Sequence, residues 1–248
     1  MAKSDRATSF GAQSGNYETG RPDYPADSVD WLLSGLPPPP RIVDLGAGTG
    51  KLTRVVAQRF PAAALTAVDP DAEMLATLSA SQPDVATAVG SAEHLPLPDG
   101  SADAVILGQA WHWVDPDAAS REIGRVVTPG GLLGLIWNIR DSREEWVARM
   151  TAVMHSSDAE DLIAGGGPSV AAPFGPVETR SWEWSRPMTR ERLHAMAASR
   201  SYLITAPDDE RAQIVADLDA LFDDLGLRGD RTIDLPYVTH AYRAIREG

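Results

Sequence analysis

The stretch IVDLGAGTGKLT, residues Ile42 to Thr53, reads as a buried strand that enters a glycine loop and then a helix. Three glycines, Gly46, Gly48 and Gly50, follow the spacing G-x-G-x-G. Glycine lets the backbone turn tightly and lets a ligand lie against the main chain. A helix that begins at Lys51 also points N–H groups at that place, which favours a carboxylate or phosphate. The stretch predicts a nucleotide-type ligand at a strand end; the alternative is that the glycines are purely structural.

Apolar strands alternate with amphipathic helices on both sides of this loop. The predicted strands cover residues 41–46, 64–69, 84–90, 102–110, 131–138, 177–186 and 232–245. The predicted helices cover residues 25–35, 51–60, 71–80, 115–131, 142–155, 189–203 and 208–225. Alternation of this kind indicates an α/β fold with a parallel sheet covered on both faces. The later helices are expected to form a cap over the sheet edge.

The composition limits the partners. The formal charge of the chain is −13, so a nucleic acid or an anionic membrane surface is disfavoured as a partner. There is no cysteine, which excludes disulfides, thiolate metal sites and cysteine nucleophiles. No apolar stretch resembles a signal peptide or a membrane span. These features favour a soluble cytoplasmic protein.

The glycine spacing also separates two classes of cofactor. A dinucleotide-binding fingerprint, G-x-G-x-x-G, needs its third glycine at Lys51 or, counted from Gly48, at Thr53. Neither register fits, so an NAD-dependent oxidoreductase is the weaker reading. Asp69 ends the second strand about 20 residues after the loop, where an acid that binds ribose hydroxyls is expected. Its alternative role is to cap the helix over residues 71–80.

Four motifs in order resemble the class I S-adenosylmethionine-dependent methyltransferases. They are VDLGAGTG, AVDPDAEML, GSAEHLPLPDGSAD and ILGQAWHW, with VVTPGGLLGLIW leading into the fifth strand. The resemblance covers residues 40–140 most strongly and is greatest to the small-molecule branch that includes ubiquinone/menaquinone and trans-aconitate methyltransferases. It implies a Rossmann-like, seven-stranded, mostly parallel sheet with helices on both faces, an antiparallel last hairpin over 177–184 and 232–242, and a helical cap.

The resemblance places the methionine half of the cofactor S-adenosylmethionine at the glycine loop. It implies that Gly46, Ala47 and Gly48 lie against this half, and that Asp44 helps to orient its amino group. Gln109, just past the fourth strand, would touch the same moiety by its carbonyl or side chain.

The nucleoside half would lie along the ends of the second and third strands. The resemblance implies that Asp69 takes both ribose hydroxyls and that Pro70 and Met74 pack on the adenine ring. Ala92 by its backbone and Glu93 by its side chain would meet the adenine edge. Two alternatives stay open: Met74 as a core residue and Glu93 as an exposed loop carboxylate.

Tyr17 and Arg21 resemble N-terminal residues that close over the cofactor in relatives; the alternative is that a long polar N-terminus has no such role. The chain is expected to form a single class I methyltransferase domain. Its expected parts are an N-terminal lid over 1–25, a cofactor-binding core over 40–140, a section with substrate-cap helices over 141–230 and a last strand over 231–248.

The segment QAWHWVDP follows the fourth strand, beside the place where the transferred methyl group should lie. His112 has a suitable ordinary pKa for a catalytic base, and Trp111 and Trp113 suit an apolar acceptor pocket or a cationic sulfonium. Alternatively, the histidine is structural and the tryptophans belong to the core. No histidine pair has metal-ligand spacing, so no metal is expected.

The methyl acceptor is expected to be a small molecule that enters from the cap side. Trp137 and Arg140 are candidate contacts there, and an arginine could bind an acceptor carboxylate; further candidates are Asn138, Trp146, Trp182, Trp184, Arg200 and Tyr202. Nucleic-acid methyltransferases often carry an N/D-P-P-Y/F-type motif where this chain has GQAWHW, and the acidic charge agrees with its absence. A non-catalytic S-adenosylmethionine-binding protein remains the alternative.

Overall fold

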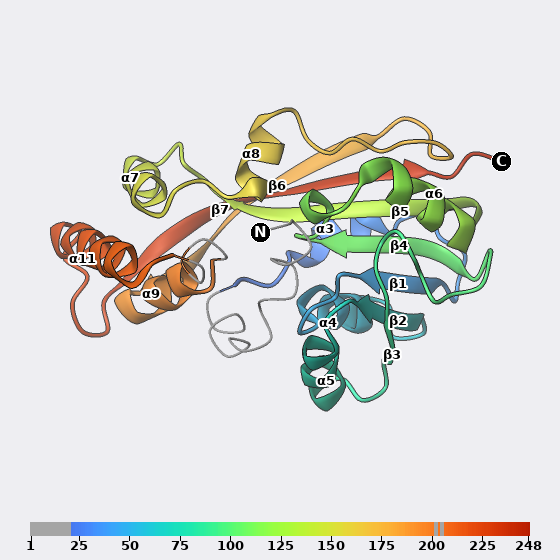
Figure 1. Cartoon of the computed structure of the whole chain (residues 1–248), viewed down its shortest axis with the longest axis horizontal. Helices are drawn as coiled ribbons and strands as arrows, with labels where there is room; N and C mark the ends of the chain where they lie inside the picture. The colour runs from blue at the N-terminus through green and yellow to red at the C-terminus, as the bar shows by residue number, and fades with distance from the viewer. Residues whose placement is uncertain (1–20, 201–202, 204–205) are drawn as a thin grey trace.

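The computed structural model describes residues 21–200, 203 and 206–248, and these residues form one seven-stranded sheet in the order β3-β2-β1-β4-β5-β7-β6 (Figure 1). Strands β1 to β5 are parallel to one another, whereas β7 runs antiparallel to both β5 and β6. This order confirms the predicted sheet and its antiparallel hairpin. The strands are β1 (Arg41–Leu45), β2 (Ala64–Asp69), β3 (Ala86–Val89), β4 (Ala102–Gly108), β5 (Val127–Arg140), β6 (Glu178–Thr189) and β7 (Thr232–Ile245).

Helices cover both faces of the parallel part, and β4 shows how the sequence assigns them. Its residues alternate between the two faces because side chains of a strand point to opposite sides in turn. Val105 and Leu107 pack in the same cluster as α6 (Pro116–Val126). Ala104 and Ile106 pack with α3 (Ala26–Leu32) and α4 (Lys51–Arg59). The remaining helix of this part, α5 (Ala72–Ser81), lies against β2 and β3.

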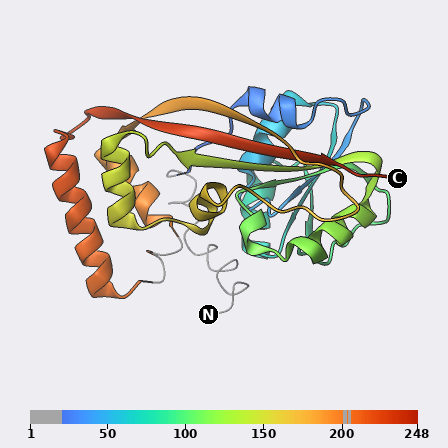
Figure 2. The same cartoon turned by 90° about the horizontal axis from the view of Figure 1, so that it is seen from above.

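A second hydrophobic cluster lies beyond the parallel strands. Three helices, α7 (Glu145–Met154), α9 (Arg190–Ala198) and α11 (Asp208–Asp224), gather around the far ends of β6 and β7 (Figures 1 and 2). Their apolar side chains share a core that includes Met150, Leu193, Leu218, Phe222 and Leu235. We call these three helices and the strand ends they cover the cap lobe. It corresponds to the predicted helical cap.

Several element boundaries differ from the sequence prediction; for example, α9 ends at Ala198 and not at residue 203. Helix α6 ends at Val126 and β5 starts at once, so residues 127–131, expected in the helix, belong to the strand. Pro129 has no N–H group to donate, and Gly130 has a φ of +78°, so neither residue continues a helix. The hairpin is also longer than expected, because β6 and β7 pair from Glu178–Arg243 to Thr189–Thr232.

A short helix was missed altogether. Helix α8 (Asp158–Ala164) begins with a capping box, in which the Ser157 hydroxyl accepts from the Glu160 N–H and the Glu160 carboxylate accepts from the Ser157 N–H. The pattern Ser-x-x-Glu is a local signature of a helix start. It was the signal in the sequence that could have revealed α8.

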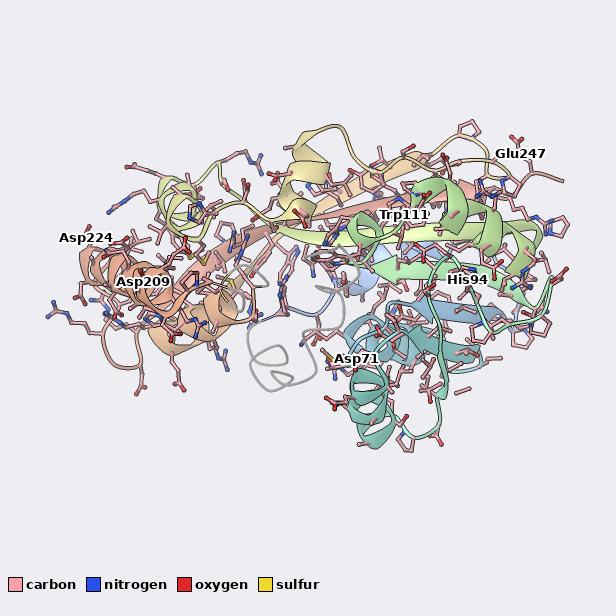
Figure 3. The ribbon with its side chains drawn as sticks, viewed as in Figure 1. Asp71, His94, Trp111, Asp209, Asp224 and Glu247 are labelled. Atoms are coloured by element: carbon pink, nitrogen blue, oxygen red, sulfur yellow. The ribbon has the colours of Figure 1, made fainter. Side chains whose placement is uncertain are left out.

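The outer side of the cap lobe carries much acidic charge. Seven of the 17 residues of α11 are Asp or Glu and one is Arg, and Figure 3 labels two of the acids, Asp209 and Asp224. The strong negative charge of the chain is thus carried in part by an exposed helix face. Within the described ranges, no helix combines the length and the apolar character needed to cross a membrane.

Candidate functional site

The glycine loop forms a tight turn between β1 and α4. The Gly46 N–H donates to the Val68 carbonyl at 2.8 Å, which ties the loop to the end of β2. Gly50 caps α4 with a φ of +87°, and a Cβ there would come within 2.4 Å of Gln82 Nε2. At Gly46, whose φ is +68°, a Cβ would lie 2.8 Å from the Cβ of Ala110. The loop therefore needs glycine for conformation and for close packing.

Asp44 is fully buried below this loop. The Thr53 hydroxyl donates to its Oδ2 at 2.5 Å, while Oδ1 has no hydrogen-bond partner in the part of the chain that the structure describes. Burial raises the pKa of this carboxyl to about 7, although the Thr53 hydrogen bond opposes the shift. A buried acceptor without a partner is costly, so this oxygen is suited to a cationic donor such as an ammonium group.

Asp69 holds the loop from the end of β2. Its Oδ2 accepts from the Gly48 N–H and its Oδ1 from the Asp71 N–H, each at 2.8 Å. Burial raises the pKa of this carboxyl, and the two backbone N–H groups oppose the shift. Asp71, not Asp69, caps α5, since its side chain accepts from the first turn of that helix. The capping alternative for Asp69 is therefore wrong. Each of its oxygens can accept a further hydrogen bond.

The residues expected around adenine lie next to Asp69 at the same sheet edge. The Gly90 N–H donates to the Asp69 carbonyl at 3.2 Å, which brings the segment after β3 beside the end of β2. Pro70 is exposed there, whereas Met74 and Ala92 are buried. Glu93 Oε1 accepts from the N–H of Asp115 at 3.1 Å, at the start of α6. Contacts of these four side chains with adenine stay predictions.

A cavity of about 790 Å³, counting its open mouth, lies between the glycine loop and the cap lobe. Gln109, at the end of β4, contributes to its wall with a φ of +58°, a backbone conformation that non-glycine residues rarely adopt. Its side-chain amide donates to the Asn138 carbonyl at 3.0 Å, which fixes the side chain against β5. The residues expected from the sequence that line this cavity are Arg21, Asp44, Gly46, Ala47, Gln109 and Arg140, together with the further candidates Asn138 and Arg200.

The aromatic residues expected around the acceptor do not line this cavity. Trp111, labelled in Figure 3, is buried, and its Nε1 donates to the Ser169 carbonyl at 3.0 Å. Trp137 is fully buried beside it in the core. Both are core residues, so burial weighs against the prediction that these two tryptophans face the acceptor, a role that stays a prediction. Trp113, in the short helix η2 (Trp111–Trp113), is half-buried and also outside the cavity wall.

His112 is held by one of these tryptophans. Trp137 Nε1 donates to His112 Nδ1 at 3.4 Å, so the neutral imidazole carries its proton on Nε2. This tautomer offers no free acceptor nitrogen at Nε2. The residue lies in η2, and it does not contribute to the cavity wall. Both observations weigh against His112 as the catalytic base, a role that stays a prediction.

The cavity wall opposite the glycine loop holds charged residues. The sequence analysis named the two arginines among them as candidates but did not name the carboxylate. Glu160 of α8 bridges two arginines: its Oε1 lies 2.7 Å from Arg140 of β5 and its Oε2 lies 2.8 Å from Arg200. Burial raises the pKa of Glu160, but the two guanidinium groups outweigh burial and lower it to about 2. Tyr237 of β7 is buried beside them and stacks on Trp184 at 4.9 Å. Glu160 and Tyr237 carry no motif that marks them as site residues.

Two expected residues, Tyr17 and Tyr202, lie outside the described residues, so their roles stay predictions. Among the described residues, no group of three or more His, Asp or Glu side chains is arranged to hold a metal ion.

Comparisons with known proteins show which family the chain belongs to. The model of the methyltransferase domain family matches residues 43–135. An uncharacterized methyltransferase of Mycobacterium bovis is 41% identical over 252 residues, with 98% of each chain covered. An uncharacterized methyltransferase-like protein of Schizosaccharomyces pombe is 32% identical over 254 residues, covering 100% of this chain and 99% of its own. A solved structure assigned to a type II methyltransferase of Anaeromyxobacter dehalogenans has a TM-score of 0.65 at 23% identity, covering 92% of this chain and 98% of that one.

The chain belongs to the class I S-adenosylmethionine-dependent methyltransferases. S-adenosylmethionine is its methyl donor. The residues at the glycine loop fit this cofactor, because the unpartnered Oδ1 of Asp44 suits the ammonium group of its methionine half. They also leave room for it, since a Cβ on Gly48 would meet no atom within 4 Å.

The open space at Gly48 leads to a prediction. Replacement of Gly48 by alanine should weaken binding of S-adenosylhomocysteine about tenfold, because the added methyl group enters space that the cofactor would use. Gly229 is a matched control: its φ of +58° is close to the +55° of Gly48, and its Cβ would also meet nothing. Both variants should lose similar stability from backbone strain, about 1–2 kcal/mol. Calorimetric titration should detect weaker binding for Gly48→Ala alone; equal losses would show that strain, not contact, is responsible.

Proposed function

We propose that this methyltransferase transfers its methyl group to a small organic acceptor held in the cavity between the glycine loop and the cap lobe, by direct in-line displacement. The observation that carries the proposal is the cavity itself, whose wall runs from Asp44 and Gln109 at the strand ends to Met196 of α9 in the cap lobe. A concave site of this kind, open to solvent at its mouth, suits a small ligand. The acidic outer helix α11 agrees with this, since a nucleic acid would need a basic surface.

Alignment and exclusion of water are the tasks that the chain's own residues would perform. The cofactor, when bound, supplies a sulfonium whose methyl group is electrophilic. Asp44, the loop glycines and Asp69 would fix the donor end, and the cap lobe would enclose the acceptor. Alignment of two reactants in one cavity can supply about 7 kcal/mol or more of the barrier.

Asp44 titrates near neutral pH but lies at the glycine loop, and on the acceptor side the described cavity wall offers no such base. It contains no histidine, and Glu160 is held ionised by two arginines, which makes it a poor proton acceptor. Burial raises the pKa of Tyr237, so its phenol stays protonated. We therefore expect an acceptor whose nucleophilic atom needs no deprotonation by the enzyme at neutral pH.

A labelling experiment tests the size of the acceptor. The purified protein is incubated with methyl-labelled S-adenosylmethionine and with a cell extract that has been filtered into small-molecule and macromolecular fractions. The expected result is label transfer to the small-molecule fraction, absent for an Asp69→Ala variant. Transfer confined to the macromolecular fraction would overturn the proposal and indicate a protein or nucleic-acid substrate.

A further inference from the structure

The far end of the cavity holds more positive than negative charge, although the chain as a whole is strongly acidic. The described wall includes four basic residues, Arg21, Lys51, Arg140 and Arg200, against two carboxylates, Asp44 and Glu160. Asp44 lies at the glycine loop and titrates near neutrality. On the cap side, Glu160 is therefore the one carboxylate in the described wall that faces Arg140 and Arg200. Two guanidinium groups and one carboxylate leave a net positive charge there.

This charge is buried. The side chains of Arg140, Arg200 and Glu160 are 4%, 10% and 14% exposed. The Nε of Arg140 has no hydrogen-bond partner among the described residues. Burial, together with repulsion from Arg200, lowers the pKa of Arg140 to about 10. A buried cation in excess of its counterions is costly in free energy, so an anion at this place would be favoured.

A structural role does not need the second arginine. The Arg140–Glu160 ion pair would be enough to tie α8 to β5. Arg200 also donates to the His155 carbonyl at 3.1 Å, a hydrogen bond that does not involve Glu160. Among the residues that the structure describes, the hydroxyl of Tyr237 has only a weak partner, the sulfur of Met196 at 3.5 Å. It is buried near the same guanidinium groups, whose charges favour its ionised form. The arrangement thus offers several donors to an anion and one phenol that can add a further hydrogen bond.

We propose that Arg140, Arg200 and Tyr237 form a subsite that binds an anionic oxygen group of the methyl acceptor, a carboxylate or a phosphate. This proposal rests on the proposed function, because it assumes that the acceptor occupies this cavity. The guanidinium groups hold the acceptor by its anionic end on the cap side, while the glycine loop holds the methyl donor at the other end. Glu160 offsets part of the positive charge and sets how strongly the anion binds.

Two variants have opposite expected effects. Arg200→Met leaves Arg140 and Glu160 as a neutral pair, so it should weaken anion binding about tenfold or more without orphaning a buried charge. Glu160→Gln removes the internal counterion but keeps a residue that can form the capping box of α8. It should strengthen anion binding about fivefold. A merely structural cluster would not gain affinity from the loss of Glu160.

The experiment measures binding to the full chain saturated with S-adenosylhomocysteine. The probes are formate, acetate and benzoate, with benzamide as the neutral counterpart of benzoate and phenyl phosphate to distinguish a phosphate from a carboxylate site. Arg149→Gln is the matched control, since this arginine is an exposed residue of the cap lobe paired with Asp224. Circular dichroism confirms that each variant is folded. Arg149→Gln should bind all probes as the unmodified protein does.

The expected result is preference for benzoate over benzamide by about tenfold, lost in Arg200→Met and increased in Glu160→Gln. Tighter binding of phenyl phosphate than of benzoate assigns the site to phosphate, and the reverse order assigns it to carboxylate. Equal binding of benzoate and benzamide, no response to any of the anions, or weaker anion binding in Glu160→Gln overturns the proposal. Failure of S-adenosylhomocysteine itself to bind overturns the proposed function instead, and is measured first.

Discussion

Asp69→Ala is expected to weaken binding of S-adenosylhomocysteine about 1,000-fold, because two ribose hydroxyls would lose a carboxylate partner. The same change also removes the acceptor of the Gly48 and Asp71 N–H groups, so the glycine loop loses its anchor. His112→Ala should change the affinity by no more than about twofold, since His112 lies outside the cavity wall. Calorimetric titration of both variants measures the difference.

A control separates binding from stability. Asp115→Ala removes the N-cap of α6, where the side chain accepts from two backbone N–H groups, and should cost about 1 kcal/mol of unfolding free energy. It should leave the affinity for S-adenosylhomocysteine unchanged. If Asp69→Ala and His112→Ala lose the same affinity, the division into cofactor-binding and other residues is wrong.

Asp44→Asn is expected to have two opposite effects. It should weaken S-adenosylhomocysteine binding about 100-fold, because a buried carboxylate no longer meets the ammonium group. It should also stabilise the ligand-free protein at pH 8. The folded-state pKa of about 7 lies above the ordinary carboxyl value of 3.8, so ionised Asp44 destabilises the fold by about 4 kcal/mol at this pH. Asparagine recovers about half of that, or about 5 °C in melting temperature.

The sign of the pH dependence follows from the same shift. A raised carboxyl pKa means that the folded state binds the proton more tightly, so the stabilising effect of Asp44→Asn grows from pH 4 to pH 7 and is constant above. The ammonium group prefers the ionised carboxylate, so affinity should fall as the pH drops below about 7. Calorimetric titrations at pH 6 and pH 8 measure the affinity, and melting temperatures at the same pH values measure the stability. An affinity of the unmodified protein that does not change with pH would contradict the role given to Asp44.

The cofactor half of the site could be predicted because its information is local. The glycine spacing sets the turn, and Asp71 and Asp115 mark helix starts as N-caps. Parallel strands also bring their carboxyl ends to one edge. Asp44 near the end of β1 and Gln109 after β4 therefore line the same cavity, although they are 65 positions apart in the chain. Order of strands and spacing of motifs were enough to place them.

The acceptor half of the site depends on the direction of side chains and on contacts between residues far apart in the sequence. The spacing of motifs along the chain predicts neither of these. Trp137 shares the face of Leu133 and Leu135 in β5, so the two-residue period assigns it to the core. Its interpretation as a pocket residue ignored that period. Glu160 meets arginines 20 residues before it and 40 residues after it. No local pattern predicts such a pairing, because it depends on how α8 and α9 dock around the sheet.

The length of the β6–β7 hairpin sets how far the cap lobe lies from the parallel strands. It would therefore limit the size of the proposed acceptor. Its pairing continues from Trp184–Tyr237, level with the end of β5, to Thr189–Thr232, five residues further. Because a strand advances about 3.4 Å per residue, adding two residues to both strands would move the cap lobe outward by about 7 Å. Such a paired insertion keeps every side chain on its face and leaves the glycine loop untouched. Relatives that methylate larger molecules are therefore expected to differ in the length of this hairpin, with the cofactor end unchanged.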